Sequence, residues 1–452
     1  MATTELQVAT CAAPTNIAVI KYWGKDSEAL NTPLNSSVSV TLHQDQLRAK
    51  TTAASAPWFQ TTKLWLNGKE QPINKRVAVV IREMKKLARD PQRWEHAQLH
   101  IVSENSFPTA AGLASSAAGY ACLVATLSEL FDAQEQFPGH LSTIARQGSG
   151  SACRSLDGGF VRWEKGNGGE NTDGTDSRAV QVCDEHHWKE LCAIICVVND
   201  REKDTSSTNG MKNSKLTSAL LNFRAEHVVN DRLQAIEHAY KKKDFPAFGK
   251  ITMQDSNQFH ATCLDTFPPI FYLNEVSRKI IGLVHAYNAH AGKVQAAYTF
   301  DAGPNAVIFL EQQHVQEVMA LLLKSFPASA GTSIEIKSSL QVDRNASADS
   351  ALLAATKVPT AGTVEPDSIK MFYVSCVGGG AQVLGASEAL VDLITGEPIL
   401  PVLRKSAIEC ATEGSSGYFW ERQVQENAWL PYVVASSALL SIVVAALMSS
   451  RR

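Results

Sequence analysis

The sequence lacks the signals that mark several large classes of protein. Its 452 residues have a formal net charge of −3, so there is no electrostatic reason to expect nucleic-acid binding. The nine cysteines are scattered, with neither a Cys-x-x-Cys pair nor the Cys/His spacing of a zinc site. The first residues contain neither a basic cluster nor an apolar run, so we expect no secretory signal. Together these absences favour reduced thiols and a cytoplasmic protein.

The composition is that of a chain that folds into globular domains. Apolar residues make up 44% of it, an ordinary share, and the length suffices for two or three domains. We find no internal repeat. Helical and strand patterns alternate with hairpins, which predicts an α+β fold of two lobes. We expect an N-terminal lobe over 1–190, a C-terminal lobe over 191–405, and a linker with an apolar tail over 406–452.

Hydrophobic periodicity predicts the main elements of these lobes. The apolar run at 191–198 is typical of a central strand. Asn67-Gly68 after a short apolar run predicts a hairpin turn. The expected elements include strands at 5–20, 37–42 and 64–66, a small-residue loop at 148–154, and a polar, irregular segment at 326–368.

The segment 105–119 combines small residues with hydroxyl groups. It reads Asn-Ser-Phe-Pro-Thr-Ala-Ala-Gly-Leu-Ala-Ser-Ser-Ala-Ala-Gly, and an apolar, helix-permissive run follows it. Such a loop before a helix lets backbone N–H groups and the helix dipole meet an anion. Ser115 and Ser116 can also contact phosphate or supply oxygen to Mg²⁺. The alternative is a helix start packed tightly against a neighbour, and the motif alone does not decide between the two.

Three other segments carry candidate functional side chains. Lys21 and Lys25 end an apolar strand, where a cation can meet a phosphate, and the alternative of a surface lysine is more expected for Lys25 than for Lys21. Arg154 follows Ser-Gly-Ser-Ala-Cys and suits bidentate capture of a carboxylate or phosphate; the alternative is a structural salt bridge. Asp301 lies at a strand end beside a glycine turn, a usual place for a general base. Its alternative is a carboxylate that only caps the turn.

Together these segments resemble the mevalonate diphosphate decarboxylase family of the GHMP kinase superfamily. The superfamily motif Pro-x-x-x-Gly-Leu-x-Ser-Ser-Ala matches Pro108 to Ala117. The elements that distinguish the decarboxylases occur in order, and the resemblance runs from about residue 7 to about residue 387. These elements are Asn16–Lys25, Asn35–Leu42, Gly148–Ser155, Asp255–His260 and Tyr298–Ala306.

The resemblance implies both a fold and a reaction. The fold would have a ribosomal-S5-like N-terminal lobe and a ferredoxin-like C-terminal lobe, with ATP in the cleft between them. The reaction would be the ATP-dependent decarboxylation of mevalonate 5-diphosphate to isopentenyl diphosphate, with release of ADP, phosphate and CO₂. It belongs to the mevalonate pathway of isoprenoid and sterol biosynthesis. The resemblance further implies a homodimer that uses ATP and Mg²⁺.

The resemblance also implies roles for individual residues. Asp301 would accept or orient the proton of the substrate hydroxyl, Lys21 would keep that carboxylate ionised, and Arg154 would hold the substrate carboxylate. The substrate pocket would include Tyr22, Ser149, Ser151, Thr208 and Met211. The ATP site would include Asn105, Pro108, Gly112, Leu113, Ser115 and Ser116, with Ser116 also contacting Mg²⁺.

Two other functions remain open at this point. A sister GHMP kinase would phosphorylate a small alcohol without eliminating phosphate and CO₂. A ligand sensor or a membrane-tethered scaffold on the same fold would need no catalytic site. The presence of Lys21, Arg154 and Asp301 favours the decarboxylase.

Three features depart from the family pattern. Asp157 stands where an aromatic residue is usual; it could pair with Arg154, but we expect it to face solvent. The turn Val377–Gln382 lacks the usual proline, which should loosen it. Leu430 to Met448 is uncharged, with Trp429 and Tyr432 at its front edge and Arg451-Arg452 behind it. This run predicts either a membrane tail anchor or a buried terminal helix, and we favour the anchor because of its terminal position.

Overall fold

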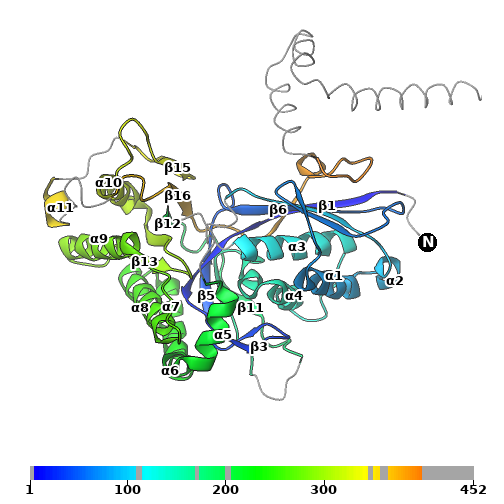
Figure 1. Cartoon of the computed structure of the whole chain (residues 1–452), viewed down its shortest axis with the longest axis horizontal. Coiled ribbons are helices and arrows are strands. Elements are labelled where there is room, and N and C mark those ends of the chain that lie inside the picture. The colour runs from blue at the N-terminus through cyan, green and yellow to red at the C-terminus, as the bar shows by residue number, and fades with distance from the viewer. Residues whose placement is uncertain are drawn as a thin grey trace, which may run out of the picture. The chain divides into compact units, whose positions relative to one another are not determined.

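The computed structural model describes residues 5–107, 115–167, 173–198, 205–344, 350–356 and 365–399 (Figure 1). The described chain up to residue 398 belongs to one compact unit. It contains three larger sheets covered by helices, which confirms the predicted α+β class. Each described cysteine is a free thiol, as expected.

The first sheet has six strands in the order β17-β1-β6-β9-β7-β8. Helix α3 packs on β1 and β6, and α1 and α4 pack beside α3 (Figure 1). The predicted hairpin joins β7 to β8, and Asn67 and Gly68 have the positive φ angles of its turn, 49° and 78°. The elements of this layer are β1 (Gln7–Pro14), β6 (Arg48–Ser55), β7 (Lys63–Leu66), β8 (Lys69–Gln71), β9 (His100–Asn105), β17 (Gln382–Leu384), α1 (Lys75–Leu87), α2 (Pro91–Trp94), α3 (Ser115–Phe131) and α4 (His140–Gly148).

The second sheet has the strand order β11-β10-β5-β2. The single strand predicted over 5–20 is wrong, because the chain leaves the first sheet after Pro14 and the Thr15 N–H donates to the carbonyl of Leu47. The loop predicted at 148–154 is largely the 3₁₀ helix η1 (Gly150–Ser155), which packs on α3 and α4. The strands here are β2 (Asn16–Ile20), β5 (Ser37–Thr41), β10 (Phe160–Trp163) and β11 (Ala179–Cys183), with a small hairpin of β3 (Lys25–Ser27) and β4 (Thr32–Pro33).

The third sheet has the order β13-β14-β12-β16-β15, so the run predicted as a central strand is the central strand β12. Helix α8 contacts both β13 of this sheet and β2 of the second sheet, which brings the two halves of the chain together at the site described below. The elements are β12 (Leu191–Val197), α5 (Ser207–Thr217), α6 (Ala219–Phe223), η2 (Arg224–Val228), α7 (Val229–Lys242), α8 (Phe245–Asp265), α9 (Glu275–Ala291), β13 (Ala296–Phe300), β14 (Ala306–Glu311), η3 (Gln312–His314), α10 (Val315–Ser325), β15 (Glu335–Ser338), α11 (Ser350–Ala355), β16 (Met371–Cys376) and η4 (Ala386–Glu388).

Two later segments differ from expectation. The irregular structure predicted over 326–368 is partly wrong, because β15 pairs in parallel with β16 and α11 forms a short helix. Their few residues are too short to show an apolar period. After β16 the chain returns to the first sheet, where β17 pairs with β1.

The predicted membrane tail at 430–448 lies outside the described residues. Among the helices that are described, none has the length and apolar character needed to cross a bilayer. The limits proposed at residues 190 and 405 stay a prediction.

Candidate active site

A cavity of about 290 Å³ collects the side chains from all four segments singled out in the sequence. Its lining includes ten of the predicted residues: Lys21, Tyr22, Ser115, Ser116, Ser149, Ser151, Arg154, Thr208, Met211 and Asp301. They come from the end of β2, the start of α3, the segment from α4 into η1, helix α5, and the end of β13. Segments far apart in sequence therefore form one site.

An ion pair forms one part of this cavity. Lys21 Nζ lies 2.6 Å from Asp301 Oδ1. The Lys21 side chain is 4% exposed, whereas that of Asp301 is 38% exposed. The carboxylate can therefore meet a ligand while the ammonium supports it from the buried side. Asp301 does more than cap its turn, which was the alternative left open by the sequence.

The turn after β13 holds Asp301 in place. Its next residues read Ala-Gly-Pro-Asn, and Gly303 N–H donates to the Asp301 carbonyl at 2.7 Å. Ser277 Oγ of α9 donates to the carbonyl of Pro304 at 2.9 Å. Asn305 Oδ1 accepts from the Val198 N–H at 2.7 Å. Neighbouring elements thus fix both sides of the turn that carries the carboxylate.

Arg154 is buried in η1 and is held by neutral oxygen atoms. Its Nε donates to Ser39 Oγ at 3.0 Å and to Asn16 Oδ1 at 3.3 Å, and its Nη1 donates to Ser37 Oγ at 2.7 Å. Its guanidinium carbon lies 5.8 Å from the ring centroid of Trp163. Within the described part of the chain no carboxylate contacts it, so the salt-bridge alternative is not supported. Its charge remains available to an anionic ligand in the cavity.

Small hydroxyl residues line another part of the cavity. Ser115 and Ser116 begin α3, where the helix dipole favours an anion. Ser116 Oγ lies 3.1 Å from Ser149 Oγ, so the α3 start and the end of α4 meet here. These hydroxyls match the needs of a phosphate group or of a hard cation such as Mg²⁺. Among the described residues, no group of three or more His, Cys, Asp or Glu side chains could hold a metal.

Aromatic packing gives the cavity a firm wall. The ring of Tyr22 meets Trp163 edge to face, with centroids 4.7 Å apart. Burial raises the pKa of Tyr22 to about 12, so the phenol stays protonated at neutral pH. Gly150 sits against both rings, and a Cβ there would lie 2.7 Å from the Tyr22 hydroxyl. This close approach explains a glycine at that position.

The charge around the cavity is mostly positive. Lys21, Lys25, Arg76 and Arg154 line it, and Asp301 is the one acid among its described lining residues. Lys25 is buried and pairs with Glu28 at 3.0 Å, so the surface alternative, which was weighed more heavily for it than for Lys21, is wrong. Four cations against one carboxylate suit a ligand with several negative charges.

The sequence-based site is only partly tested by this geometry. Asn105 ends β9 and is absent from the described lining of the cavity. Pro108, Gly112 and Leu113 lie outside the described residues. The structure therefore brings together the predicted catalytic and substrate residues and two of the six predicted ATP residues, Ser115 and Ser116.

Several lining residues were not assigned a role from sequence. They include Asn16, Asn31, Arg76, Ser207 and Phe259. Asn16 begins the distinctive segment Asn16–Lys25, and that position is the signal that could have identified it, whereas its contact with Arg154 is visible only in the structure. Arg76 offers no such signal, since it lies in the first turn of the amphipathic helix α1.

Asp157 is partly exposed to solvent and does not pair with Arg154, so of the two alternatives for it the pairing is not supported. Its backbone carbonyl accepts from Thr41 Oγ1 at 3.1 Å, which fixes this turn against β5. Burial raises the pKa of its carboxyl group above the ordinary value. Arg154 donates to Asn16, Ser37 and Ser39 instead, so among the described residues Asp157 does not neutralise the Arg154 charge.

Known proteins resemble this chain over most of its length. The model of the diphosphomevalonate decarboxylase-like N-terminal domain matches residues 13–179, and that of the mevalonate 5-diphosphate decarboxylase C-terminal domain matches residues 193–384. The diphosphomevalonate decarboxylase of Rattus norvegicus is 49% identical over 385 residues, which cover 83% of this chain and 93% of the relative.

Solved structures agree with this assignment. The mevalonate diphosphate decarboxylase from Trypanosoma brucei is 38% identical, with a TM-score of 0.74, over 85% of this chain and all (100%) of that one. A structure described as MDDEF in complex with MVAPP, AMPPCP and magnesium is 29% identical, with a TM-score of 0.63, over 84% and 100% of the two chains. With its two-lobed α+β fold of the GHMP kinase type, the chain belongs to the diphosphomevalonate decarboxylase family.

Proposed function

We propose that this protein catalyses the ATP-dependent decarboxylation of mevalonate 5-diphosphate to isopentenyl diphosphate, with release of ADP, phosphate and CO₂. The observation that carries the proposal is the contact of Lys21 Nζ with Asp301 Oδ1, at 2.6 Å, in a cavity that Arg154 also lines. A base for a hydroxyl group and a cation for a carboxylate are the two groups that this reaction needs in one place. Family membership supports the same activity.

Asp301 acts on the tertiary hydroxyl of the substrate. A tertiary alcohol is a poor leaving group, so its oxygen first attacks the γ-phosphorus of ATP and ADP departs. Asp301 accepts or orients the hydroxyl proton, and its exposed carboxylate can reach a ligand from the cavity wall. The Lys21 ammonium favours the ionised form of that carboxylate and offsets negative charge on the phosphoryl group in transit.

Arg154 holds the carboxylate that becomes CO₂. After phosphorylation, the C–O bond to phosphate breaks as the electron pair of the adjacent C–C bond forms the alkene. That step requires a fixed carboxylate removed from bulk water. Arg154 is buried, is oriented by Ser37 and Ser39, and has no carboxylate partner in the described chain. The same cavity offers Tyr22, Ser149, Ser151, Thr208 and Met211 to the rest of the substrate.

ATP and Mg²⁺ fit the hydroxyl-rich part of the cavity. Ser115 and Ser116 would face the ATP phosphates from the start of α3, with Lys25 and Arg76 adding positive charge. Ser116 would supply oxygen to Mg²⁺, which neutralises phosphate charge when bound and takes few protein ligands. Asn105, Pro108, Gly112 and Leu113 complete the proposed ATP site. The related complex with AMPPCP and magnesium supports ATP and Mg²⁺ as the ligands of this site.

One assay distinguishes this function from those of a sister kinase and of a sensor. Purified protein is incubated with mevalonate 5-diphosphate, ATP and Mg²⁺, and ADP and CO₂ are measured together. Equal amounts of both are expected. ADP without CO₂ would mean a kinase that stops after phosphoryl transfer, and neither product would mean a non-catalytic protein.

We further propose a cytoplasmic homodimer, as the resemblance implies. Analytical ultracentrifugation at micromolar concentration should give twice the chain mass of 49.0 kDa. A mass of one chain across the concentration range would exclude the dimer.

We propose that residues 430–448 tether this enzyme to a membrane. Deletion of residues 425–452 should move the protein from the membrane fraction to the supernatant and leave kcat unchanged. If the truncated protein instead unfolds, the segment is part of a folded core and the tether is wrong.

A further inference from the structure

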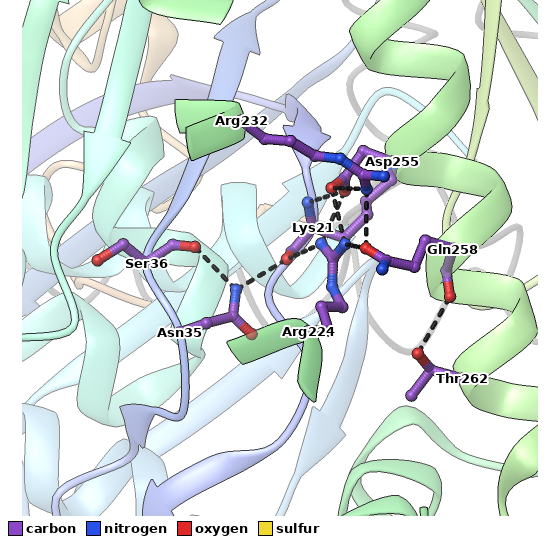
Figure 2. A network of polar contacts seen from close by, with 8 residues as sticks. All are labelled: Lys21, Asn35, Ser36, Arg224, Arg232, Asp255, Gln258 and Thr262. Carbon is purple, nitrogen blue, oxygen red and sulfur yellow. Dashed lines mark hydrogen bonds and ion pairs between the residues drawn. The ribbon is translucent and has the colours of Figure 1, made fainter. Parts of the chain in front are cut away.

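Both backbone polar groups of Lys21 are held by side chains from distant parts of the chain (Figure 2). Its N–H donates to Asp255 Oδ1 at 2.8 Å. Its carbonyl accepts from Arg224 Nη2 at 2.9 Å and from Asn35 Nδ2 at 3.0 Å. Lys21 follows directly after β2, so these contacts replace the sheet hydrogen bonds that end there. The peptide that carries the site ammonium is therefore fixed on both sides.

The side chains that fix this peptide form a buried ion pair of their own. Arg224 Nη1 lies 2.7 Å from Asp255 Oδ2, its Nη2 lies 2.8 Å from Oδ1, and both side chains are 0% exposed. Arg232 Nη1 adds a contact to Oδ2 at 3.0 Å. Burial alone would raise the pKa of Asp255, but the Arg224 charge and hydrogen bonds outweigh it and hold that pKa below its ordinary value.

The backbone that presents Arg224 is unusual. Arg224 begins η2, a π-helical turn between α6 and α7. Such turns are rare and occur frequently at functional sites. A buried ion pair is also weak support for stability, because removing two charges from water offsets most of their attraction. Neither the helix turn nor the ion pair is explained by packing alone.

We propose that Arg224 and Asp255 are positioning residues, which fix the Lys21 peptide so that its ammonium meets Asp301. The inference rests on the proposed function, because it assigns Lys21 a part in the reaction. Neither residue lines the described cavity, so they act through Lys21 and not on the substrate. A displacement of about 1 Å at a reacting group can cost on the order of 100-fold in rate.

The test is a cycle of Arg224→Met and Lys21→Met. Arg224→Met keeps the side-chain volume, and Arg232 still accompanies the Asp255 carboxylate. It should lower kcat roughly 10- to 100-fold when Lys21 is present and leave both KM values within about twofold. In the Lys21→Met background it should change kcat by less than about twofold, because the group that it positions is gone. Single-turnover CO₂ release gives the readout for slow variants.

Arg162→Met is the matched control. Arg162 Nη1 pairs with Glu237 Oε1 at 2.9 Å and joins β10 to α7, its other ion pair is with Glu164, and it is outside the described lining of the cavity. This variant should leave kcat unchanged in both backgrounds. Arg162→Met therefore measures how the loss of an arginine ion pair affects turnover when that arginine does not contact Lys21.

Equal losses from Arg224→Met in both backgrounds would overturn the proposal, because the pair would then act as a structural element only. If Arg224→Met does not fold, Arg224→Lys takes its place. It retains the charge beside Asp255 but loses the fork that also reaches the Lys21 carbonyl, so it should depend on the background in the same way. A wild-type protein that releases no CO₂ would instead refute the proposed function.

Discussion

Two buried arginines stand at opposite ends of strand β2 and have different partners. At its start, Asn16 meets Arg154, whose other contacts are the hydroxyls of Ser37 and Ser39. Just past its end, Lys21 meets Arg224, which pairs with a carboxylate through both of its terminal nitrogens. One guanidinium is thus held by neutral oxygens and the other is neutralised within the protein.

This difference in partners gives the two arginines different roles: Arg154 can bind a ligand, and Arg224 positions Lys21. Burial lowers the pKa of Arg154, and the charge of Asp301, which does not contact it, offsets only part of that effect. Its charge is costly to the free protein and can be satisfied by an anionic ligand. The charge of Arg224 is already satisfied by Asp255, so its remaining donor can serve the Lys21 backbone. Four variants test this difference between Arg154 and Arg224.

Asp301→Asn should have the largest effect. Arg224 positions Lys21 beside Asp301, Arg154 holds the substrate, and Asp301 is the group that acts on the substrate hydroxyl. We expect kcat to fall about 10³- to 10⁴-fold, since the amide cannot accept the hydroxyl proton. ATP binding should change little, because the loss falls in the transition state. Rate measurements and nucleotide titration test the two parts. Turnover near that of the wild type would remove Asp301 as the base.

Asp255→Leu should destabilise the fold by about 3–5 kcal/mol, because it leaves the Arg224 charge buried and uncompensated. Urea unfolding followed by circular dichroism measures the change. Combining it with Arg224→Met should restore most of the stability, since the fully buried charge is then gone and the remaining Arg232 is partly exposed and donates to Gln258. A small loss in the single variant would show that the Arg224 charge does not depend on Asp255.

Arg154→Met should lower activity without lowering stability, whereas Asp255→Leu should lower stability. No buried carboxylate loses its partner, so the free energy of unfolding should stay the same or rise. The value of kcat/KM for mevalonate 5-diphosphate should fall about 10²- to 10³-fold, as expected for removing a buried charge contact. Arg154→Lys should recover part of it. A stability loss as large as that of Asp255→Leu would erase the distinction between the two arginines.

The sequence predicted the substrate side of the site well because its chemistry lies in short segments. Lys21 and Asp301 each follow an apolar strand, Arg154 lies in a run of small residues, and all three meet at one cavity. The strands β5 and β12 were predicted nearly to their limits, since their buried residues form clear patterns.

The positioning residues could not be predicted in this way. Arg224 and Arg232 lie in a long helical pattern, where an arginine usually indicates a solvent-exposed face. Their role depends on the π-helical turn and on α8 packing against β2, which are properties of the folded chain. The passage of the chain from the first to the second sheet at Thr15 could not be predicted for the same reason, because the hydrogen bond from Thr15 to Leu47 is a tertiary contact.

Substitution of His260 should have the smallest effect of the four, and it tests how well the Lys21 end of β2 excludes water. Burial, and then the nearby Lys21 charge, lower its pKa to about 3. The unfolded chain therefore binds a proton between about pH 6.5 and pH 3 that the folded protein does not, so stability falls as pH falls through this range. From pH 7 to pH 5 this residue should cost about 2 kcal/mol. His260→Gln should remove that part of the slope in urea unfolding. If His260→Gln leaves the pH dependence of the free energy of unfolding unchanged, the folded protein binds a proton at His260 beside Lys21. The end of β2 would then be open to water, contrary to the buried surroundings of the Arg224–Asp255 pair.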